Sequence, residues 1–200
     1  MQTKTPSRTK SQVFVPSSTK SLKENAVPLP QTGVLGKLLT DLEIDGRCVK
    51  ALQEFRYQLR YRLYDIAEHL ATRCRRVGLE AEGLIKPDPF GEEATPRASI
   101  RKLRRSAALQ WLNATLEGRF DSEFSRLLRH RWIPIMLADY RDAHPAPFLI
   151  ESFYNYAEGF LTSYVFDKPA ESLIAEAWTL HAIRQALDLQ RRIFGLEWDR

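Results

Sequence analysis

Apolar residues recur every three or four positions through most of the chain from residue 41 onward, the spacing that places them on one side of an α-helix. The first such run consists of Leu52, Phe55, Leu59, Leu63, Ile66 and Leu70. Arginines occupy the remaining faces of the same stretch. The run therefore predicts one long amphipathic helix that packs on a single side and ends at Gly78.

A second helical pattern begins near Ser99 and ends at Gly118, a residue type that commonly terminates helices. Asp121 follows as a predicted N-cap, because a short carboxylate side chain can accept a hydrogen bond from a free N–H of the first helical turn. Apolar residues continue behind it as far as Pro134, which predicts a kink or an end of that helix.

Two more helices are predicted, over 148–165 and from about Pro169 towards Phe194. The Pro- and Gly-rich stretch 83–96 reads as an irregular connection, and sustained period-two alternation, the mark of a strand, is missing from the sequence. The pattern predicts an all-α domain of about six helices over residues 33–200, with no internal repeat.

Residues 1–32 differ in composition from the rest, with ten Ser or Thr and four prolines. Such a segment buries too little apolar surface to offset its ordering entropy, so we expect a flexible arm. An organelle transit peptide has a similar composition. Within residues 1–30 the charged side chains are Lys4, Arg8, Lys10, Lys20, Lys23 and Glu24, a balance of +4 that leaves +1 of the total +5 for residues 31–200.

This distribution of charge bears on the expected partners. A basic arm favours docking on an acidic partner, whereas an almost neutral body argues against specific nucleic-acid binding. The sequence contains neither an apolar run long enough for a membrane-spanning helix nor the pattern of a secretory signal, which together favour a cytoplasmic protein.

The usual catalytic motifs are missing from the sequence: it contains no GxGxxG, GxxxxGK[ST], GxSxG or HExxH pattern, and none of its histidines has the Glu-x-x-His spacing of a di-iron site. Cys48 and Cys74 lie in helical patterns and are expected to be free, buried thiols. Asp65 and His69, four residues apart on one helix, predict a surface ion pair. An enzyme is therefore the least supported class of function.

The stretch LQWLNATLEGRFDSEFSRLLRHRWIP at 109–134 resembles the middle of the globin domain of bacterial globin-coupled sensors and protoglobins. The matching positions are Trp111, Gly118, Phe120, Asp121, Phe124, Arg126, Arg129 and Arg131. Residues 50–70 are similar to the long first conserved helix of that family, and residues 175–189 to its final helix. The resemblance covers roughly residues 40–195 and implies a globin fold.

The resemblance also implies a haem b site, from which this sequence departs. At the expected position of the axial histidine stand Ile135 and Met136, and the distal tyrosine of the family is replaced by Ala67. Candidate iron ligands are then His144, His130 and Met136. The pocket that the resemblance implies would be lined by Leu63, Ala67, Trp111, Leu128, Trp132 and Phe153.

Three functions follow as hypotheses. The first is a haem-less globin-fold regulatory module that acts through protein–protein contacts and forms a homodimer through its last two helices. Its expected interface residues are Phe153, Tyr156, Phe160 and Tyr164. The second is a haem-b gas sensor or carrier, and the third a structural subunit that its basic arm anchors in a larger assembly.

Overall fold

The computed structural model describes residues 33–84, 98–137, 145–166 and 173–195. Every regular element in these ranges is a helix, which confirms the predicted all-α class. The predicted arm at 1–32 and most of the 83–96 connection lie outside the described residues. The elements are α1 (Gly33–Asp41), α2 (Gly46–Leu59), α3 (Leu63–Ala81), α4 (Ala98–Glu117), α5 (Ser122–Leu127), the π-helical segment η1 (Leu128–Trp132), α6 (Ile133–Leu137), α7 (Pro147–Phe166) and α8 (Leu173–Gly195).

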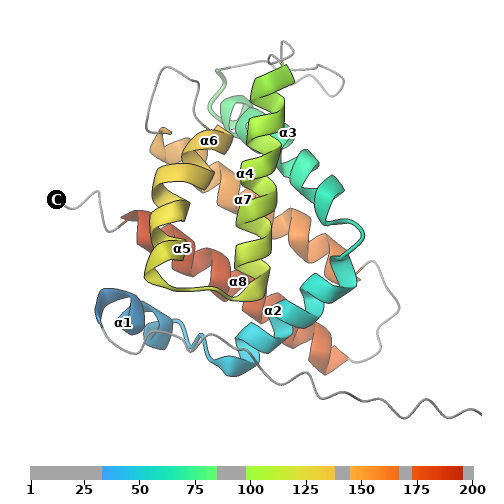
Figure 1. The fold of residues 1–200 in the computed structure, drawn as a ribbon, viewed down its shortest axis with the longest axis vertical. Helices are drawn as coiled ribbons and strands as arrows, with labels where there is room; N and C mark the ends of the chain where they lie inside the picture. Colours follow the sequence, from blue (N-terminus) through green and yellow to red (C-terminus); the bar gives the residue numbers. More distant parts are fainter. Residues whose placement is uncertain (1–32, 85–97, 138–144, 167–172, 196–200) are drawn as a thin grey trace, which may run out of the picture.

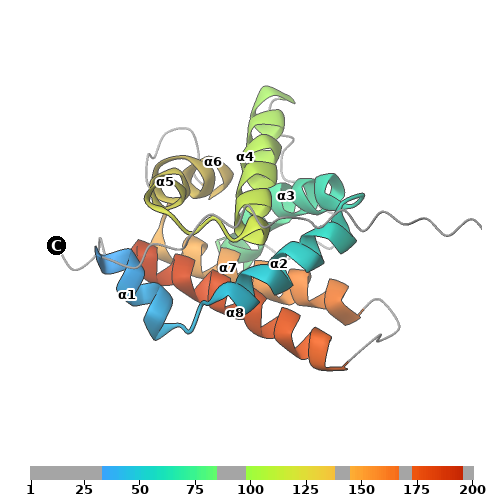
Figure 2. The same cartoon turned by 60° about the horizontal axis from the view of Figure 1, so that its bottom comes forward.

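The helices cross one another in two layers around a single hydrophobic core (Figure 1). In the front layer of that view α4 runs beside the rod formed by α5, η1 and α6, and α7 and α8 lie behind both. Figure 2 shows α2 crossing over α8, with α1 against the other end of α8. Helix α3 packs on α4 and on α7, so the centre of the core lies where α3, α4, α7 and α8 meet.

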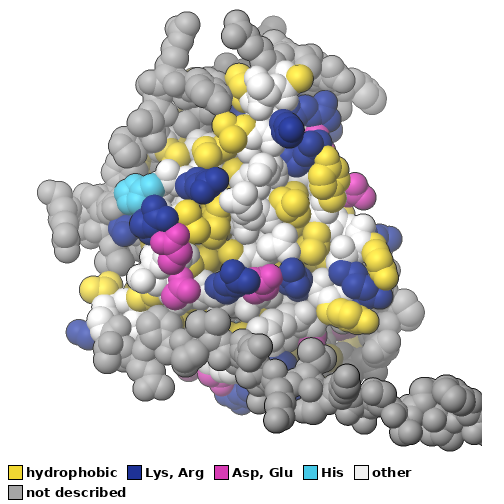
Figure 3. Space-filling view, viewed as in Figure 1, with side chains coloured by type: hydrophobic (Ala, Val, Ile, Leu, Met, Phe, Trp, Pro, Cys, Tyr) yellow, Lys and Arg dark blue, Asp and Glu magenta, His cyan; other side chains and the backbone are white. Residues whose placement is uncertain are grey.

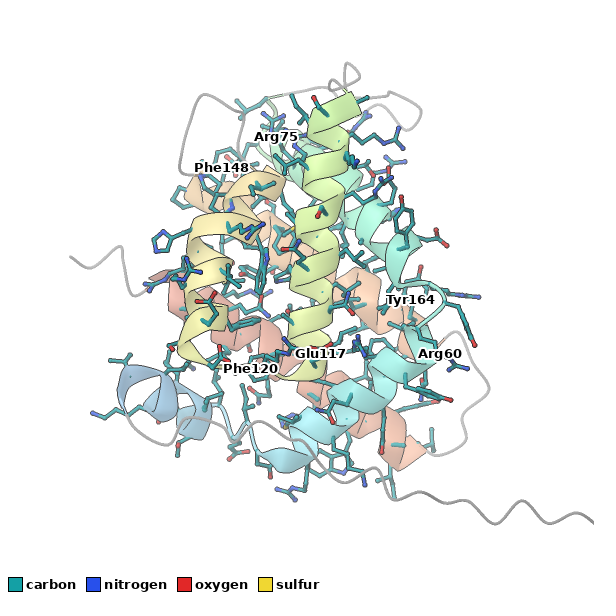
Figure 4. The ribbon with its side chains drawn as sticks, in the orientation of Figure 1. Arg60, Arg75, Glu117, Phe120, Phe148 and Tyr164 are labelled. Carbon is teal, nitrogen blue, oxygen red and sulfur yellow. The ribbon has the colours of Figure 1, made fainter. Side chains whose placement is uncertain are left out.

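The turn after α4 forms as the sequence predicts. Gly118 adopts a φ of +70°, a left-handed conformation that side chains with a Cβ rarely take. A Cβ at this position would also lie 2.8 Å from a Cγ of Val49 on α2. Glu117 and Phe120 flank this turn at the lower end of α4 (Figure 4). Asp121 then caps α5 by accepting a 2.7 Å hydrogen bond from the backbone N–H of Phe124, which confirms the predicted N-cap.

The prediction of one long helix through residues 50–70 is wrong. The chain turns at residues 60–62, so that α2 packs on α8 and α4 whereas α3 packs on α4 and α7. Gly78 does not end the helix either, since α3 continues to Ala81. A Cβ at Gly78 would lie 2.8 Å from Leu149 Cδ2, so this glycine permits the close approach of α3 to α7.

Pro134 does not end its helix, because α6 runs through it to Leu137. The π-helical segment η1 lies directly before α6, and its last hydrogen bond runs from the N–H of Ile133 to the carbonyl of Leu128. A π-helical turn changes the angular register of the residues that follow it. None of the described helices combines the length and the hydropathy that crossing a membrane requires.

Candidate functional site

The residues expected to line a haem pocket form a packed part of the core. Ala67, Trp111, Leu128, Trp132 and Phe153 are all buried, and Leu63 is partly buried against them. The ring centroids of Trp111 and Phe153 lie 5.0 Å apart in an edge-to-face arrangement, as do those of Trp132 and Phe124 at 5.6 Å. The first contact joins α4 to α7, and the second joins α5 to η1.

The space between α4 and the opposing rod is bridged by a side-chain hydrogen bond. Trp132 Nε1 on η1 donates to Gln110 Oε1 on α4 at 3.3 Å. Helix α4 also packs directly on η1 and on α6. The pocket residues expected from the resemblance include Trp111 of α4 and Leu128 and Trp132 of η1, and side chains of these two elements contact each other.

The candidate iron ligands, which the sequence offers as alternatives, differ in their exposure to solvent. Met136 is buried in the core on α6, whereas His130 on η1 is exposed to solvent. His144 lies outside the described residues. Ile135 and Ala67 offer no donor atom, and within the described part of the chain no group of three His, Cys, Asp or Glu side chains could hold a metal ion. Among the described candidates Met136 is therefore the one buried donor, and a haem site stays a prediction.

A buried polar network, which the sequence did not reveal, links α4 to α8. Trp111 Nε1 donates to Gln190 Oε1 at 2.7 Å, and Gln190 Nε2 donates to Thr115 Oγ1 at 3.1 Å. Gln190 has no solvent-exposed surface. A polar residue among apolar neighbours in the final helix is the sequence feature that could have indicated this network. The network fixes the register of the two helices, because an unpaired polar group at this depth is costly.

Of the expected interface residues on α7, Tyr156 and Phe160 contact helix α3, and Phe153 contacts Trp111 of α4. Phe153 is fully buried and cannot contact a partner. Tyr156, Phe160 and Tyr164 are partly buried in a ladder of rings, in which the ring of Phe160 stacks on His69 of α3 at 4.2 Å. Phe153 is therefore corrected to a core residue, whereas Tyr156, Phe160 and Tyr164 keep part of their area exposed and the expected dimer stays a prediction.

His69 contacts α7 rather than forming the expected ion pair with Asp65. Its Nε2 shares a 2.5 Å hydrogen bond with the hydroxyl of Tyr156. Burial lowers the pKa of His69, and the guanidinium of Arg73 lowers it further. Cys74 is buried on the same helix, and its burial raises the pKa of the thiol far above its usual range. Both cysteines are free and buried, as predicted.

Two surface features carry large exposed side chains that the packing within the protein does not use. The first, which we call the α8 apolar face, comprises Leu173, Ile174, Ala177 and Trp178 in the first two turns of α8. Leu173 and Ile174 are 78% and 72% exposed. Arg47 of α2 lies over the ring of Trp178, 4.9 Å from its centroid, and fixes one side of the indole.

The second feature lies at the α2–α3 junction, and we call it the tyrosine–arginine surface. It comprises Tyr57, Arg60, Tyr61, Tyr64 and Arg105. Figure 4 labels Arg60, which directly follows α2, and Tyr164 near the end of α7, whose ring lies 5.9 Å from the guanidinium of Arg62. In the space-filling view, basic and apolar side chains alternate over the part of the molecule where α2 and α3 lie (Figure 3).

No protein-family model, no curated protein and no solved structure matches this chain. The all-helical architecture is therefore described from the structure itself, and the resemblance to globin-coupled sensors stays a prediction. A function can therefore be proposed only from the surfaces and contacts of the described residues.

Proposed function

We propose that the protein is a non-catalytic regulatory module that acts through protein–protein contacts and self-associates through the α8 apolar face. The observation that carries the proposal is the exposure of Leu173 and Ile174 at the start of a helix that is otherwise packed into the core. Exposed apolar side chains that lie together on one element are typical of interaction sites.

The four residues form a continuous stripe. Residues four apart in an α-helix lie on the same side of it, one turn from each other. Leu173 therefore neighbours Ala177, and Ile174 neighbours Trp178. All four are exposed, and none is charged. The stripe therefore offers nearly two turns of helix whose apolar side chains are exposed, apart from the face of Trp178 that Arg47 of α2 covers.

A second copy of the chain is the occupant that we infer. In a two-fold dimer the same patch lies on both sides of the interface, so an apolar stripe is covered by an identical apolar stripe. Moving a fully exposed Leu or Ile out of water contributes about 1.5–3 kcal/mol. The globin-coupled sensor resemblance likewise implies a dimer through the last two helices, and the proposal moves its contact from α7 to the first turns of α8.

Sedimentation equilibrium of the full chain at micromolar concentration tests the proposal. We expect a dimer for the wild type and a large shift towards monomer for the double variant Leu173→Ser/Ile174→Ser. The control is Val34→Ser, which removes an apolar side chain that is 60% exposed from α1. Circular dichroism checks that all three proteins are folded.

A monomeric wild type at all accessible concentrations would contradict the proposal. So would a double variant that associates as strongly as the wild type. If Val34→Ser dissociates the dimer as well, the contact is not specific to the α8 apolar face.

A further inference from the structure

The tyrosine–arginine surface is unusual for the amount of aromatic area that it exposes. Tyr57, Tyr61 and Tyr64 occur within eight residues of one another and are 67%, 82% and 50% exposed. Tyrosine and arginine are the residue types that most often dominate the binding energy of protein interfaces. Neither the core nor the α8 apolar face accounts for their presence at this junction.

Arg60 is held in place by its neighbours. Its guanidinium carbon lies 4.1 Å from the ring centroid of Tyr57 and 4.4 Å from that of Tyr61. Its Nη1 also donates a 2.8 Å hydrogen bond to the carbonyl oxygen of Tyr57. A guanidinium that is fixed before binding loses less side-chain entropy when it binds a ligand, so the geometry favours recognition of an anion.

The charges around this surface are unbalanced. Arg101 and Arg105 share one carboxylate, since Glu68 contacts Arg101 Nε at 2.7 Å and Arg105 Nη1 at 3.1 Å. Within the described part of the chain, no carboxylate is within ion-pair distance of Arg60, and its raised pKa reflects its tyrosine neighbours. Among the described residues, the arginines of this surface contact one carboxylate, that of Glu68, so Arg60, Arg101 and Arg105 stand against a single acid.

We propose that the tyrosine–arginine surface binds an acidic peptide segment of a partner protein. The carboxylates of such a segment would pair with Arg60 and Arg105, and its backbone and apolar atoms would lie on the exposed tyrosine rings. Planar guanidinium groups bind carboxylates through two parallel hydrogen bonds, which a fixed arginine presents in a defined direction.

Two other occupants fit this surface less well. The protein's own arm carries +4, so it is repelled by a basic surface. A second copy in a two-fold contact would bring two basic surfaces together. For a single-stranded nucleic acid, guanidinium groups take one face of each of the three tyrosines and leave the other face for base stacking.

Fluorescence anisotropy with the full chain tests the inference. The probe is a fluorescein-labelled oligoglutamate peptide at physiological ionic strength, and oligoglutamine is the uncharged comparison. We expect Arg60→Gln to weaken oligoglutamate binding by about tenfold. Arg192→Gln is the matched control, because it removes the same charge from an exposed position in the last turn of α8, and it should change the Kd by less than about twofold.

A second pair of variants tests separately what the ring and the hydroxyl of Tyr61 contribute to binding. Tyr61→Phe keeps the ring beside Arg60 and should bind oligoglutamate like the wild type. Tyr61→Ser removes the ring and should weaken binding by about fivefold, since the cation–π contact no longer holds the guanidinium. The basic arm is present in every variant, so differences among them report on this surface alone.

Equal effects of Arg60→Gln and Arg192→Gln would overturn the inference, as would no binding of oligoglutamate at about 1 mM. Tighter, Arg60-dependent binding of an oligothymidine strand would overturn it in favour of a nucleic-acid partner. The inference does not depend on self-association, which uses α8 and which sedimentation tests separately.

Discussion

Replacing Gln190 with leucine tests the buried network that joins α4 to α8. The substitution keeps the size of the side chain but removes both the acceptor for Trp111 Nε1 and the donor to Thr115 Oγ1. The indole N–H, fully buried, is then left without a partner, which costs about 1–3 kcal/mol. The Thr115 hydroxyl can turn to a carbonyl of its own helix, so its loss is smaller. We expect the free energy of unfolding to fall by about 2 kcal/mol.

Urea denaturation followed by circular dichroism measures this change. Gln185→Leu on the same helix is the matched control, because Gln185 is partly exposed, and it should change the stability by less than about 0.5 kcal/mol. The double variant Trp111→Phe/Gln190→Leu removes both partners and should lose less than the sum of the two single variants. A Gln190→Leu protein as stable as the wild type, or strict additivity, would refute the reasoning.

Three further predictions concern the turn after α4, the His69 pair and haem. Gly118→Ala should destabilise the protein by about 2–4 kcal/mol in urea denaturation, because it combines a left-handed backbone with a clash against Val49. For His69, burial holds the folded pKa below the ordinary 6.5, so the unfolded chain takes up a proton first as the pH falls. Stability should therefore decrease as the pH falls below about 6.5, and His69→Phe, which retains a ring against Phe160, should make thermal unfolding less dependent on pH in this range. Titration of the purified protein with hemin should leave the spectrum of free hemin unchanged, since α4 packs directly on η1 and α6.

Two control variants and one contrary outcome accompany these predictions. Gly159→Ala, in the middle of α7 and with open space around the new Cβ, should stabilise rather than destabilise. His130→Phe, at an exposed site, should retain the full pH dependence. A Soret band that sharpens at one equivalent of hemin and disappears in Met136→Ala would show that the core opens for a haem.

Local chemistry decided which parts of the fold the sequence could predict. The Asp121 cap and the Gly118 turn depend on side chains within a few residues, so the pattern alone identified them. The break at residues 60–62 contains neither Gly nor Pro, and the spacing of Leu59 and Leu63 continues the helical period across it. The break follows from packing against different helices, which a linear pattern does not record.

The candidate site was harder to predict for a related reason. Periodicity shows which side of a helix is apolar but not which side a neighbouring helix covers. The aromatic stripe of α7 was therefore expected to form an interface, whereas Phe153 is fully buried and Tyr156 and Phe160 contact His69 of α3. The first turns of α8 read as an ordinary amphipathic helix, although Leu173 and Ile174 remain exposed.

The distance between the α8 helices of two copies is the most direct test of self-association through the α8 apolar face. Both native cysteines are buried, so Ala175→Cys supplies an accessible thiol for a spin label beside the α8 apolar face without altering it. Facing helices pack with axes about 8–10 Å apart. Pulsed electron paramagnetic resonance should therefore give a short, narrow intermolecular distance, and Leu173→Ser/Ile174→Ser should abolish it. No dipolar coupling in the labelled protein, or coupling that survives the double substitution, would contradict self-association through α8.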